Sequence, residues 1–468
     1  MATRIIKKVL EQVVIGDIVD GGRCIAHVDD LVLFVARVAP GDVVDLKVVR
    51  KKKGYAEAVP IYTHKAGRAR IPPICQHFGT CGGCQWQHVH YAEQLAAKER
   101  LVLDKLVRIG HIQHPHVAPI IAANPTEYYR NKLEFTFSNS RWLSATEIGE
   151  HRPLDRRALG FHKPNYFDKV VDITHCHLQP APSNAIRNTL AQFARTHGLT
   201  FYDLRHNSGL LRNLIIRIAA TGEVMVIVQF GQAVKEKIEQ VMHHLKTQFP
   251  QLTSLQYVVN TKKHENFYDL PVHLYHGQAH ITEQLNGLKF RIGPKSFFQT
   301  NTAQAQVLYK KIRELASLHQ DEVLYDLYTG VGSIALFLAQ HVRHVVGVDV
   351  TKEAIVDAHA NAKLNNVGNV TFVSGAVEKL LDAQFLSVHG TPHVIIIDPP
   401  RAGIHPQVVK QLLRMSPRRM VYVSCNPATQ ARDMAHLCKK YQLVTAQPVD
   451  MFPHTSHIEN IALLTLKP

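Results

Sequence analysis

Short apolar stretches separated by turn residues characterise the first 63 residues of the chain. Alternation of apolar and polar residues with a period of two is typical of β-strands, and Gly-Gly and Pro-Gly pairs mark turns. The pattern predicts five strands, at 13–20, 23–28, 31–35, 42–49 and 55–62. Five short strands with a basic loop at 50–54 are typical of a small β-barrel of the oligonucleotide-binding kind. A solvated turn is the alternative interpretation of that loop.

Strands and helices alternate from about residue 297 to the end of the chain. Apolar runs predict the strands, and helical periodicity predicts the segments between them. Strands are expected at 323–327, 344–349, 370–374, 394–398 and 420–424, and helices at 333–340, 352–365 and 406–413. Repeated strand–helix–strand units indicate a doubly wound parallel sheet of the Rossmann-like type.

The middle of the chain has a mixed pattern, and the length of 468 residues favours two or three domains. A helix is predicted at 91–109, followed by a region with strands at 133–137, 214–219, 224–229 and 254–260. The expected fold class is therefore α/β. We expect an N-terminal barrel at 1–63, a central α+β domain at 64–295 and a doubly wound domain at 296–468, on which the helix at about 91–110 packs.

The charge balance is basic, with 54 Lys and Arg against 38 Asp and Glu, a formal net charge of +16. This excess favours an anionic partner, first of all RNA or DNA, although a basic surface without a binding role is the alternative. No apolar stretch approaches the 20 or so residues of a membrane span, and the N-terminus lacks a signal-peptide core. We therefore expect a cytoplasmic monomer without a membrane partner.

A glycine-rich segment, Asp326-Leu-Tyr-Thr-Gly-Val-Gly-Ser333, lies between a predicted strand and a predicted helix. Gly330 and Gly332 allow a tight turn and the close approach of a ligand to backbone N–H groups. Asp349 ends the next strand, where a carboxylate can accept both hydroxyls of a ribose. The loop alone fits a nicotinamide dinucleotide as well as S-adenosylmethionine. Its first residues, together with Asp398-Pro-Pro-Arg401, favour S-adenosylmethionine.

The segment Val421-Tyr-Val-Ser-Cys-Asn-Pro427 begins with a mostly apolar run that ends on a cysteine, Cys425. A strand end is a rigid position for a nucleophile, although a buried strand cysteine is the alternative reading. Thiolate addition to C6 of a uracil makes C5 nucleophilic, and a base must then remove the C5 proton. Cys425 fits the nucleophile. The candidates for the base are His454, His457 and Glu459, and free pKa values favour a histidine unless burial raises that of the glutamate.

Three cysteines, Cys75, Cys81 and Cys84, share one glycine-rich segment, and Cys176 between two histidines is a candidate for a fourth. Four thiolates suit either an iron–sulfur cluster or tetrahedral zinc. The spacing by itself leaves both open and slightly favours zinc. Cysteines without any ligand are the third interpretation.

Together these motifs resemble the RNA uracil-5-methyltransferase family over nearly the whole chain. The resemblance includes a TRAM-like RNA-binding barrel, the cysteine segment, Phe297-Phe-Gln-x-Asn301, the glycine loop, Asp-Pro-Pro-Arg, Ser-Cys-Asn-Pro and Phe-Pro-His-Thr-x-His-x-Glu. It implies that Cys425 is the nucleophile and that Glu459, in place of a histidine, is the general base. It also implies that the residues around cofactor and uracil are Gln299, Tyr328, Ser333, Asp349 and Asp398.

The chain departs from the family at two of these positions, because family members often carry Asn where Ser333 stands and Glu where Asp349 stands. Both residues keep a hydrogen-bonding side chain, so both stay in the expected cofactor site. Phe297 and Phe298 are expected in the core rather than stacked on a base.

A subset of this family, which the chain resembles, binds a [4Fe-4S] cluster through this cysteine spacing and a distant fourth cysteine. The resemblance thus implies a cluster, with zinc as the alternative, held by Cys75, Cys81, Cys84 and Cys176. The cysteines and the TRAM-like barrel favour 23S ribosomal RNA as the partner, with methyl transfer to C5 of a uridine. The same reaction on tRNA is one alternative, and a non-catalytic RNA-binding or ribosome-assembly factor is another.

Overall fold

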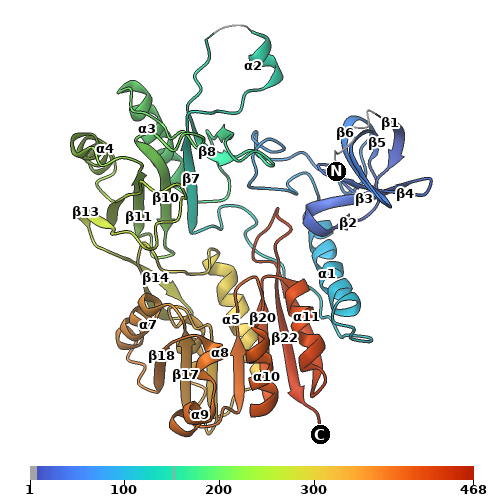
Figure 1. Ribbon diagram of the computed structural model, residues 1–468, viewed down its shortest axis with the longest axis vertical. Helices are drawn as coiled ribbons and strands as arrows, with labels where there is room; N and C mark the ends of the chain where they lie inside the picture. The colour runs from blue at the N-terminus through green and yellow to red at the C-terminus, as the bar shows by residue number, and fades with distance from the viewer. Residues whose placement is uncertain (1–7, 151–152) are drawn as a thin grey trace. The chain divides into compact units, whose positions relative to one another are not determined.

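A computed structural model describes residues 8–150 and 153–468 of the chain (Figure 1). The chain divides into two compact units. Unit 1 takes in the chain up to Gly79, together with Gly83–Thr126 and His393–Pro468, and unit 2 takes in Thr80–Gly82 and Glu127–Pro392. Within the described ranges, no helix has both the length and the apolar character that a membrane crossing requires.

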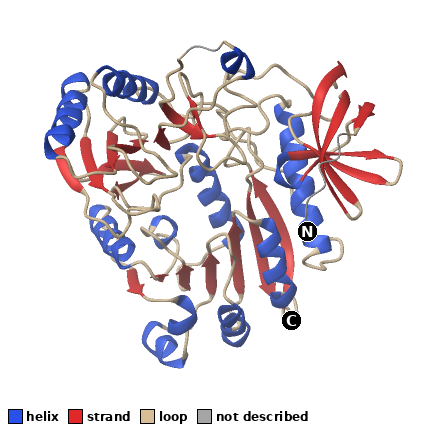
Figure 2. Ribbon diagram, turned by 45° about the horizontal axis from the view of Figure 1, so that its top comes forward, coloured by secondary structure: helices blue, strands red, loops and turns tan. Residues whose placement is uncertain are grey.

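The N-terminal part of unit 1 is a six-stranded sheet in the order β1-β5-β6-β4-β3-β2 (Figure 2). Its strands are β1 (Val9–Val14), β2 (Ile18–Val19), β3 (Arg23–Val28), β4 (Leu31–Val35), β5 (Val43–Lys52) and β6 (Tyr55–Lys65). The strand predicted at 13–20 is wrong as a single strand. β1 pairs with β5 and β2 pairs with β3, so the chain changes partner at Gly16, whose N–H donates to Ile25 O. The closed TRAM-like barrel stays a prediction.

The core of this sheet follows from the alternation in the sequence. Alternate residues of β4 and β5, such as Leu33, Val35, Val44 and Leu46, are fully buried. The same apolar cluster extends past the sheet to Trp86, Val89 and Ala97. Burial of these residues away from water fixes the segment that follows the cysteines to the N-terminal sheet.

The rest of unit 1 combines a long helix with the last part of the chain. Its elements are α1 (Tyr91–Arg108), β19 (Val394–Ile397), α10 (Pro406–Met415), β20 (Arg419–Ser424), α11 (Pro427–Leu437), β21 (Tyr441–Val449) and β22 (Glu459–Leu466). α1 packs against α11 and β21. β19 and β20 are parallel, whereas β22 is antiparallel to both β20 and β21. The expectation of a wholly parallel sheet is therefore wrong at β22, because the chain turns straight back after β21 without a crossover helix.

Unit 2 begins with a seven-stranded sheet in the order β13-β12-β11-β10-β7-β8-β9. Its elements are β7 (Lys132–Ser138), α2 (Ala145–Gly149), β8 (Ala158–His162), β9 (Val170–Asp172), α3 (Ser183–Thr196), β10 (Leu211–Ile218), β11 (Val224–Phe230), α4 (Lys235–Gln248), β12 (Ser254–Val259) and β13 (His273–Gly277). Every residue of β10 and β11 is buried. The apolar run of β11 made that strand predictable, whereas β10 also buries Arg212 and Asn213, and the strand predicted at 214–219 missed its first three residues.

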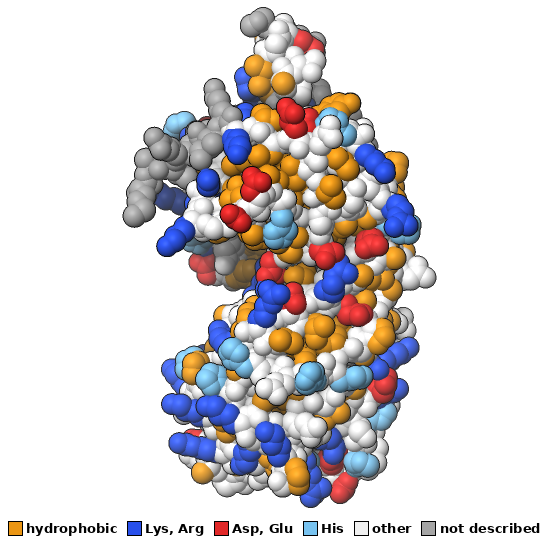
Figure 3. All heavy atoms as spheres, turned by 90° about the vertical axis from the view of Figure 1, so that its right-hand side faces the viewer, with side chains coloured by type: hydrophobic (Ala, Val, Ile, Leu, Met, Phe, Trp, Pro, Cys, Tyr) orange, Lys and Arg blue, Asp and Glu red, His pale blue; other side chains and the backbone are white. Residues whose placement is uncertain are grey.

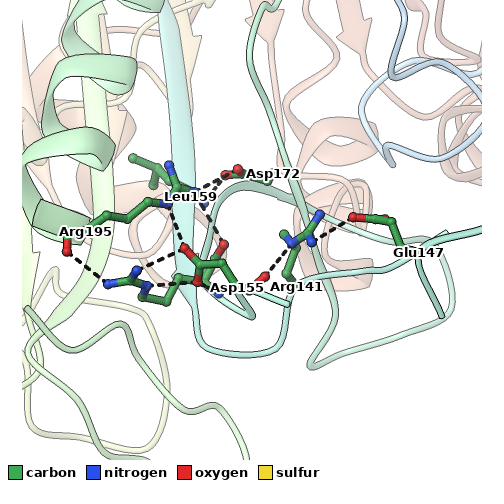
Figure 4. A network of polar contacts seen from close by, with 7 residues as sticks. Arg141, Glu147, Asp155, Leu159, Asp172 and Arg195 are labelled. Carbon is green, nitrogen blue, oxygen red and sulfur yellow. Dashed lines mark hydrogen bonds and ion pairs between the residues drawn. The ribbon is translucent and has the colours of Figure 1, made fainter. Parts of the chain in front are cut away.

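Charged side chains tie the long connection between β7 and β8 to its surroundings (Figure 4). Arg141 donates to Asp155 O and to Glu147, each at 2.8 Å. Arg195 of α3 lies 3.5 Å from the Asp155 carboxylate and donates to Asp172 of β9 at 2.8 Å. These ion pairs hold the connection against α3 and β9.

The second part of unit 2 contains a hairpin and three parallel strands in the order β18-β17-β16. Its elements are β14 (Ile281–Leu285), β15 (Leu288–Ile292), α5 (Thr302–Ala316), β16 (Val323–Leu327), α6 (Ser333–Ala339), β17 (His344–Asp349), α7 (Lys352–Leu364), β18 (Val370–Ser374), α8 (Val377–Leu380) and α9 (Ala383–His389). The predicted bounds of β16, β17 and β18 are confirmed to the residue.

Candidate active site

Cys425 stands between a strand and a helix in unit 1. It follows Ser424, the last residue of β20, and precedes Asn426, the N-cap of α11. Asn426 Oδ1 accepts a hydrogen bond from Ala428 N at 3.2 Å, and Pro427 occupies the first turn of the helix. This cap and proline start the helix at once, and they leave Cys425 at the junction beside the positive end of the helix dipole.

Glu459 reaches the same place from the other strand. It is the first residue of β22, and Ser424 pairs with Asn460 in the antiparallel register. Cys425 follows Ser424 and Glu459 precedes Asn460, so these two residues lie directly beyond the last pair of the ladder, at the same end of the two strands. Glu459 is 4% exposed. The register thus brings together the predicted nucleophile and the predicted base.

The segment from Asp398 to Arg401 leaves the sheet at the same end. Asp398 directly follows β19, whose Ile397 pairs with Tyr422 of β20. Burial raises the pKa of Asp398 to about 7. Burial also raises the pKa of Glu459 well above its usual value, with the charge of Asp398 adding to the shift and the Arg401 guanidinium opposing it. Two neighbouring carboxyl groups therefore favour their protonated forms.

The thiol of Cys425 is held neutral by its environment. Burial raises its pKa to about 11, and the charges of Glu459 and Asp398 add to that effect, while Arg401 opposes it. At neutral pH the resting site therefore holds Cys425 as a thiol, and burial favours the protonated form of Glu459. A cation that enters the site would favour the ionised form of both groups.

Helix α11 fixes the loop that carries Arg401. Asn426 Nδ2 and Thr429 Oγ1 both donate to Arg401 O, at 3.1 and 3.2 Å. One turn further along, Asp433 Oδ2 accepts from Ile404 N at 2.8 Å. These three side chains come from one face of the helix, so the loop from Arg401 to Ile404 is held along its length.

A buried amide pair joins α11 to the two strands of the site. Gln430 Nε2 donates to Tyr422 O at 2.8 Å and to Asn460 O at 3.1 Å. Asn460 Nδ2 in turn donates to Gln430 Oε1 at 2.7 Å. Sequence reasoning missed these residues and the helix itself. The signal was present, because Asn followed by Pro is a typical N-cap and first residue of a helix.

The two histidines that free pKa values favoured have other surroundings. His454 is buried, and burial lowers its pKa to about 4. Its Nδ1 lies 3.3 Å from Gln94 Nε2. His457 is exposed. Of the three candidates, Glu459 is the one whose charge acts on the thiol of Cys425, and it lies next to the last pair of the β20–β22 ladder.

The glycine loop lies in unit 2 and connects β16 to α6. Gly330 N donates to Asp349 Oδ2 at 2.9 Å, and Thr351 N donates to Asp349 Oδ1 at 2.8 Å. Gly330 has a φ of 55°, and a Cβ there would meet nothing within 4 Å. Gly332 has a φ of 80°, and a Cβ there would lie 2.9 Å from the Phe372 ring. Gly330 therefore leaves open space at the turn, and Gly332 permits close packing.

The other predicted cofactor residues border the same part of unit 2 in sequence. Tyr328 follows β16 with a φ of 67°, in the left-handed region. Ser333 is the first residue of α6, and its hydroxyl lies 2.8 Å from Tyr309 OH. Gln299 precedes α5, and its carbonyl accepts from Asn131 Nδ2 at 2.8 Å. Their backbones are therefore fixed, and the Gln299 side chain takes no part in that bond.

The two phenylalanines before Gln299 differ in environment. Phe298 is buried, with its ring centroid 5.7 Å from that of Phe290. Phe297 is 70% exposed. The expectation of a core position is confirmed for Phe298 and wrong for Phe297, because the packing against Phe290 uses one of the two neighbouring rings.

The predicted metal ligands belong to both units. In unit 1, Cys75 N donates to Gln87 Oε1 at 3.2 Å, and Gln87 Nε2 donates to Cys84 Sγ at 3.3 Å. One glutamine side chain thus links two of the cysteines. Cys81 belongs to unit 2.

Cys176 lies in unit 2, after β9, and is buried. Its N–H donates to Asn184 Oδ1 at 2.8 Å, and Arg187 donates to the same oxygen at 2.9 Å. Arg187 is fully buried, and its Nε has no hydrogen-bond partner. A buried guanidinium beside Cys176 favours a negative charge on the sulfur, so the local chemistry fits a thiolate ligand.

Across residues 8–150 and 153–468, no group of three or more His, Cys, Asp or Glu side chains is arranged to hold a metal ion. The four-cysteine site therefore stays a prediction, and no step of the chemistry below depends on it.

Comparisons with known proteins agree with these motifs. The sequence model of the family described as tRNA (uracil-5-)-methyltransferase matches residues 216–467. An RNA methyltransferase of Bacteroides thetaiotaomicron is 49% identical over 450 residues, covering 95% of this chain and 99% of the relative. One of Porphyromonas gingivalis is 46% identical over 458 residues, covering 96% and 98%.

A solved structure extends the likeness to the fold. The crystal structure of the tRNA (uracil-54, C5)-methyltransferase of Pyrococcus abyssi, in complex with S-adenosyl-L-homocysteine, matches with a TM-score of 0.72. It is 28% identical, and the match covers 97% of this chain and 99% of that one. The mixed α/β fold of a methyltransferase, expected from the strand–helix pattern, is thereby confirmed.

Proposed function

The chain belongs to the RNA uracil-5-methyltransferase family and is an S-adenosylmethionine-dependent RNA methyltransferase, and we propose that it methylates C5 of a uridine in 23S ribosomal RNA through a bond between Cys425 and C6. One observation carries the mechanism. The ladder of β20 and β22 ends with Ser424 paired to Asn460, so Cys425 and Glu459 lie at the same end of the two strands, which supports a nucleophile and a base that face the same pyrimidine ring.

Cys425 begins the reaction. The thiol first releases its proton to solvent, and the lone pair of the resulting thiolate forms the S–C6 bond while the π electrons of C5=C6 shift toward C5 and O4 of the uracil. S-adenosylmethionine, when bound, supplies a methyl group that C5 can attack, and its own sulfur keeps the electron pair of the broken bond. The Arg401 guanidinium and the N-terminus of α11 stabilise the negative charge on the sulfur before the attack.

Glu459 completes the reaction. Its carboxylate takes the proton from C5, the electrons of that C–H bond restore C5=C6, and the C6–S bond breaks to release the thiolate. A carboxyl group with a raised pKa is a stronger base than an ordinary glutamate, which suits removal of a carbon-bound proton near neutral pH. Asp398, with a pKa of about 7, can either donate to or accept from the edge of the base.

We infer that the cofactor is held by seven residues: Gln299, Tyr328, Gly330, Gly332, Ser333, Asp349 and Asp398. Asp349 supports this inference because each of its oxygens accepts one backbone N–H and keeps a second lone pair for a ribose hydroxyl. The open space at Gly330 supports it as well, since a ligand can approach the backbone there.

The RNA partner is proposed from surface chemistry. Residues 50–53, a run of one arginine and three lysines at the β5–β6 turn, are exposed. Lys and Arg side chains are spread over the face drawn in Figure 3, with acidic side chains among them. Phe297, exposed beside the cofactor residue Gln299, can stack on a base. tRNA is the second candidate, favoured by the family description and by the tRNA enzyme of Pyrococcus abyssi.

We also propose that Cys75, Cys81, Cys84 and Cys176 hold a [4Fe-4S] cluster, with zinc as the alternative. The link through Gln87 and the buried Arg187 support it. Protein purified without oxygen should contain iron and absorb in the visible region, and Cys176→Ser should lose both. A wild-type sample with neither iron nor visible absorbance would contradict the cluster, and stoichiometric zinc in it would favour the alternative.

The test of the activity uses methyl-labelled S-adenosylmethionine with ribosomal RNA and tRNA that lack 5-methyluridine. We expect wild type to label 23S RNA, Cys425→Ala to label none, and Glu459→Gln to accumulate a covalent protein–RNA adduct. Cys438→Ala is the matched control, because Cys438 lies at the far end of α11 from Cys425. Labelling that survives Cys425→Ala would reject the thiol mechanism, and labelling of tRNA alone would select the second substrate.

A further inference from the structure

We propose that a buried cluster of polar residues, formed by Lys98, Asp450 and Gln94, positions Glu459 for removal of the C5 proton. This inference rests on the proposed function, since it assigns these residues to the second half of that reaction. They are positioning residues that act through the chain between β21 and β22. We refer to Asp450–Ile458 as the base loop, because it leads to the proposed base. It connects Val449 of β21 to Glu459 of β22, and these two residues pair with each other.

The first part of the cluster is an ion pair without solvent. The side chains of Lys98 and Asp450 are both 0% exposed, and Lys98 Nζ lies 2.6 Å from Asp450 Oδ1. Lys98 Nζ also donates to Phe452 O at 3.1 Å, and Tyr91 OH donates to Asp450 Oδ2 at 2.8 Å. Helix α1 thus holds the first residues of the base loop by both carboxylate oxygens and by the backbone.

The second part of the cluster holds the middle of the base loop. Gln94, one turn before Lys98 on α1, accepts from His454 N through Oε1 at 2.9 Å. Its amide nitrogen donates to the carbonyl oxygens of Trp86 and Val89, which fixes its orientation. His454 has a φ of 65°, a left-handed conformation that is unfavourable for a residue with a Cβ. The bond from Gln94 helps to hold the loop in that conformation.

The segment after Cys84 holds the last part of the base loop. The N–H groups of Gln85 and Trp86 both donate to His454 O, at 2.8 and 3.0 Å. Gln85 Oε1 accepts from Ser456 N at 2.9 Å, three residues before Glu459. Residues of the segment Gln85–Lys98 therefore form hydrogen bonds along the base loop, from Asp450 to Ser456.

The chemistry of the ion pair favours a geometric role over a stabilising one. Two buried charges lose their hydration, and apolar residues of similar size often stabilise a fold at least as well. An ion pair with several hydrogen bonds instead defines one arrangement of the loop. The pairing of β22 with β20 and β21 fixes the backbone from Glu459 onward. The base loop fixes the backbone that precedes Glu459.

A displaced Glu459 should affect one half of the reaction. Formation of the S–C6 bond and transfer of the methyl group need Cys425 and the cofactor, and they do not need the base. Removal of the C5 proton needs the carboxylate within hydrogen-bonding distance. Without it the C6–S bond stays intact, and methylated RNA remains attached to Cys425.

The test separates adduct formation from product release. It uses 23S RNA and tRNA, each transcribed once with uridine and once with 5-fluorouridine. Fluorine at C5 cannot leave as a proton, so an adduct on 5-fluorouridine reports the first half alone. We expect Lys98→Met to form that adduct within about twofold of the wild-type rate. With uridine RNA it should release product at least tenfold more slowly and accumulate the adduct. Arg195→Met is the matched control, because it breaks an ion pair in unit 2.

A second variant separates positioning from folding. Lys98→Met combined with Asp450→Leu removes both buried charges, so it should recover the wild-type melting temperature and still accumulate the adduct. Release at the wild-type rate by this double variant would overturn the inference. An equal loss of both halves in every folded variant of the cluster would overturn it too. Failure of wild type to form the 5-fluorouridine adduct would reject the proposed function instead.

Discussion

The environment of Cys425 determines both the fraction of thiolate at a given pH and the nucleophilicity of that thiolate. Burial and two carboxyl groups raise its pKa to about 11, so little thiolate is present at neutral pH. The same shift makes each thiolate a better nucleophile, because nucleophilicity rises with the basicity of the sulfur. Addition to C6 of a uracil is a demanding step, and a basic thiolate released only in the loaded site suits it. The resting enzyme is thereby protected from oxidation and alkylation.

This environment predicts slow alkylation of Cys425 by iodoacetamide. A pKa two units above the ordinary 9.0 lowers the thiolate fraction about 100-fold, and the higher nucleophilicity restores about tenfold, so a net slowing of about tenfold is expected. The rate should rise about tenfold per pH unit up to pH 10. At a pH high enough to ionise Glu459, Glu459→Gln removes a negative neighbour and should speed the reaction. Mass spectrometry of the Cys425 peptide measures it, and a plateau below pH 9 would contradict the shift.

Glu459 predicts a dependence of stability on pH. Its pKa in the folded protein is raised by burial, so folding at pH 7 requires either uptake of a proton or burial of a charge. Relative to high pH, the protonated Glu459 side chain favours the folded state. This contribution to the free energy of unfolding is complete below the unfolded pKa of about 4.5 and is lost as the pH rises through the raised folded pKa. Glu459→Gln should therefore raise the melting temperature at pH 7, because the neutral amide needs no proton and buries no charge.

The difference between Glu459→Gln and wild type should shrink toward pH 4.5, where both side chains are neutral. The exposed Glu236 on α4 provides the control, because Glu236→Gln removes a carboxylate that stays in water. A Glu459→Gln protein that is less stable than wild type at pH 7 would contradict the burial of an unfavourable charge.

Among the elements of unit 1, helix α11 does most to organise the site. Its N-terminus follows Cys425, and its side chains hold the loop from Arg401 to Ile404. Gly403 belongs to that loop and has a φ of 82°, and a Cβ there would lie 2.5 Å from Asp433 Oδ2. Glycine therefore serves two purposes at this position, because it permits the left-handed backbone and leaves room for Asp433.

Gly403→Ala should displace the loop and with it Arg401. We expect kcat/KM to fall at least tenfold, with a loss of stability of about 1–2 kcal/mol from the left-handed backbone alone. Gly222→Ala is a matched control, because Gly222 has a φ of 87° and a Cβ there meets nothing within 4 Å. It should lose similar stability and keep full activity. Equal kinetics of the two variants would contradict a role for the loop.

The elements also show what one sequence can predict. β16, β17 and β18 were predictable to the residue because each is a short run of mostly apolar and β-branched residues. The strand predicted at 420–424 was followed by no predicted helix, and the start of α11 at Pro427 was missed. Motifs predicted a nucleophile and a base, Cys425 and Glu459. The register that pairs their strands depends on long-range contacts, as does the ion pair of Lys98 with Asp450, 352 residues apart. Such contacts leave no local pattern.

At the scale of the whole molecule, the net charge of +16 governs the encounter with RNA. Binding that neutralises phosphates releases counterions, so the affinity falls with salt by a slope of about 0.7 per phosphate contact on single strands. If the β5–β6 turn contacts RNA, replacing Lys51, Lys52 and Lys53 by Gln removes up to three such contacts. The logarithmic slope should then fall by as much as about 2.

Net charge alone would act differently from a specific contact, and α4 allows the two to be separated. Lys235, Lys237 and Lys246 on that helix are exposed, and their replacement by Gln changes the net charge by the same amount. We expect this control to weaken RNA binding only slightly and to leave the salt slope almost unchanged. Filter binding to 23S RNA between 50 and about 300 mM salt measures both quantities. Equal slopes for the two triple variants would mean that the N-terminal sheet contributes only its charge, and the RNA contacts would then have to lie elsewhere on the chain.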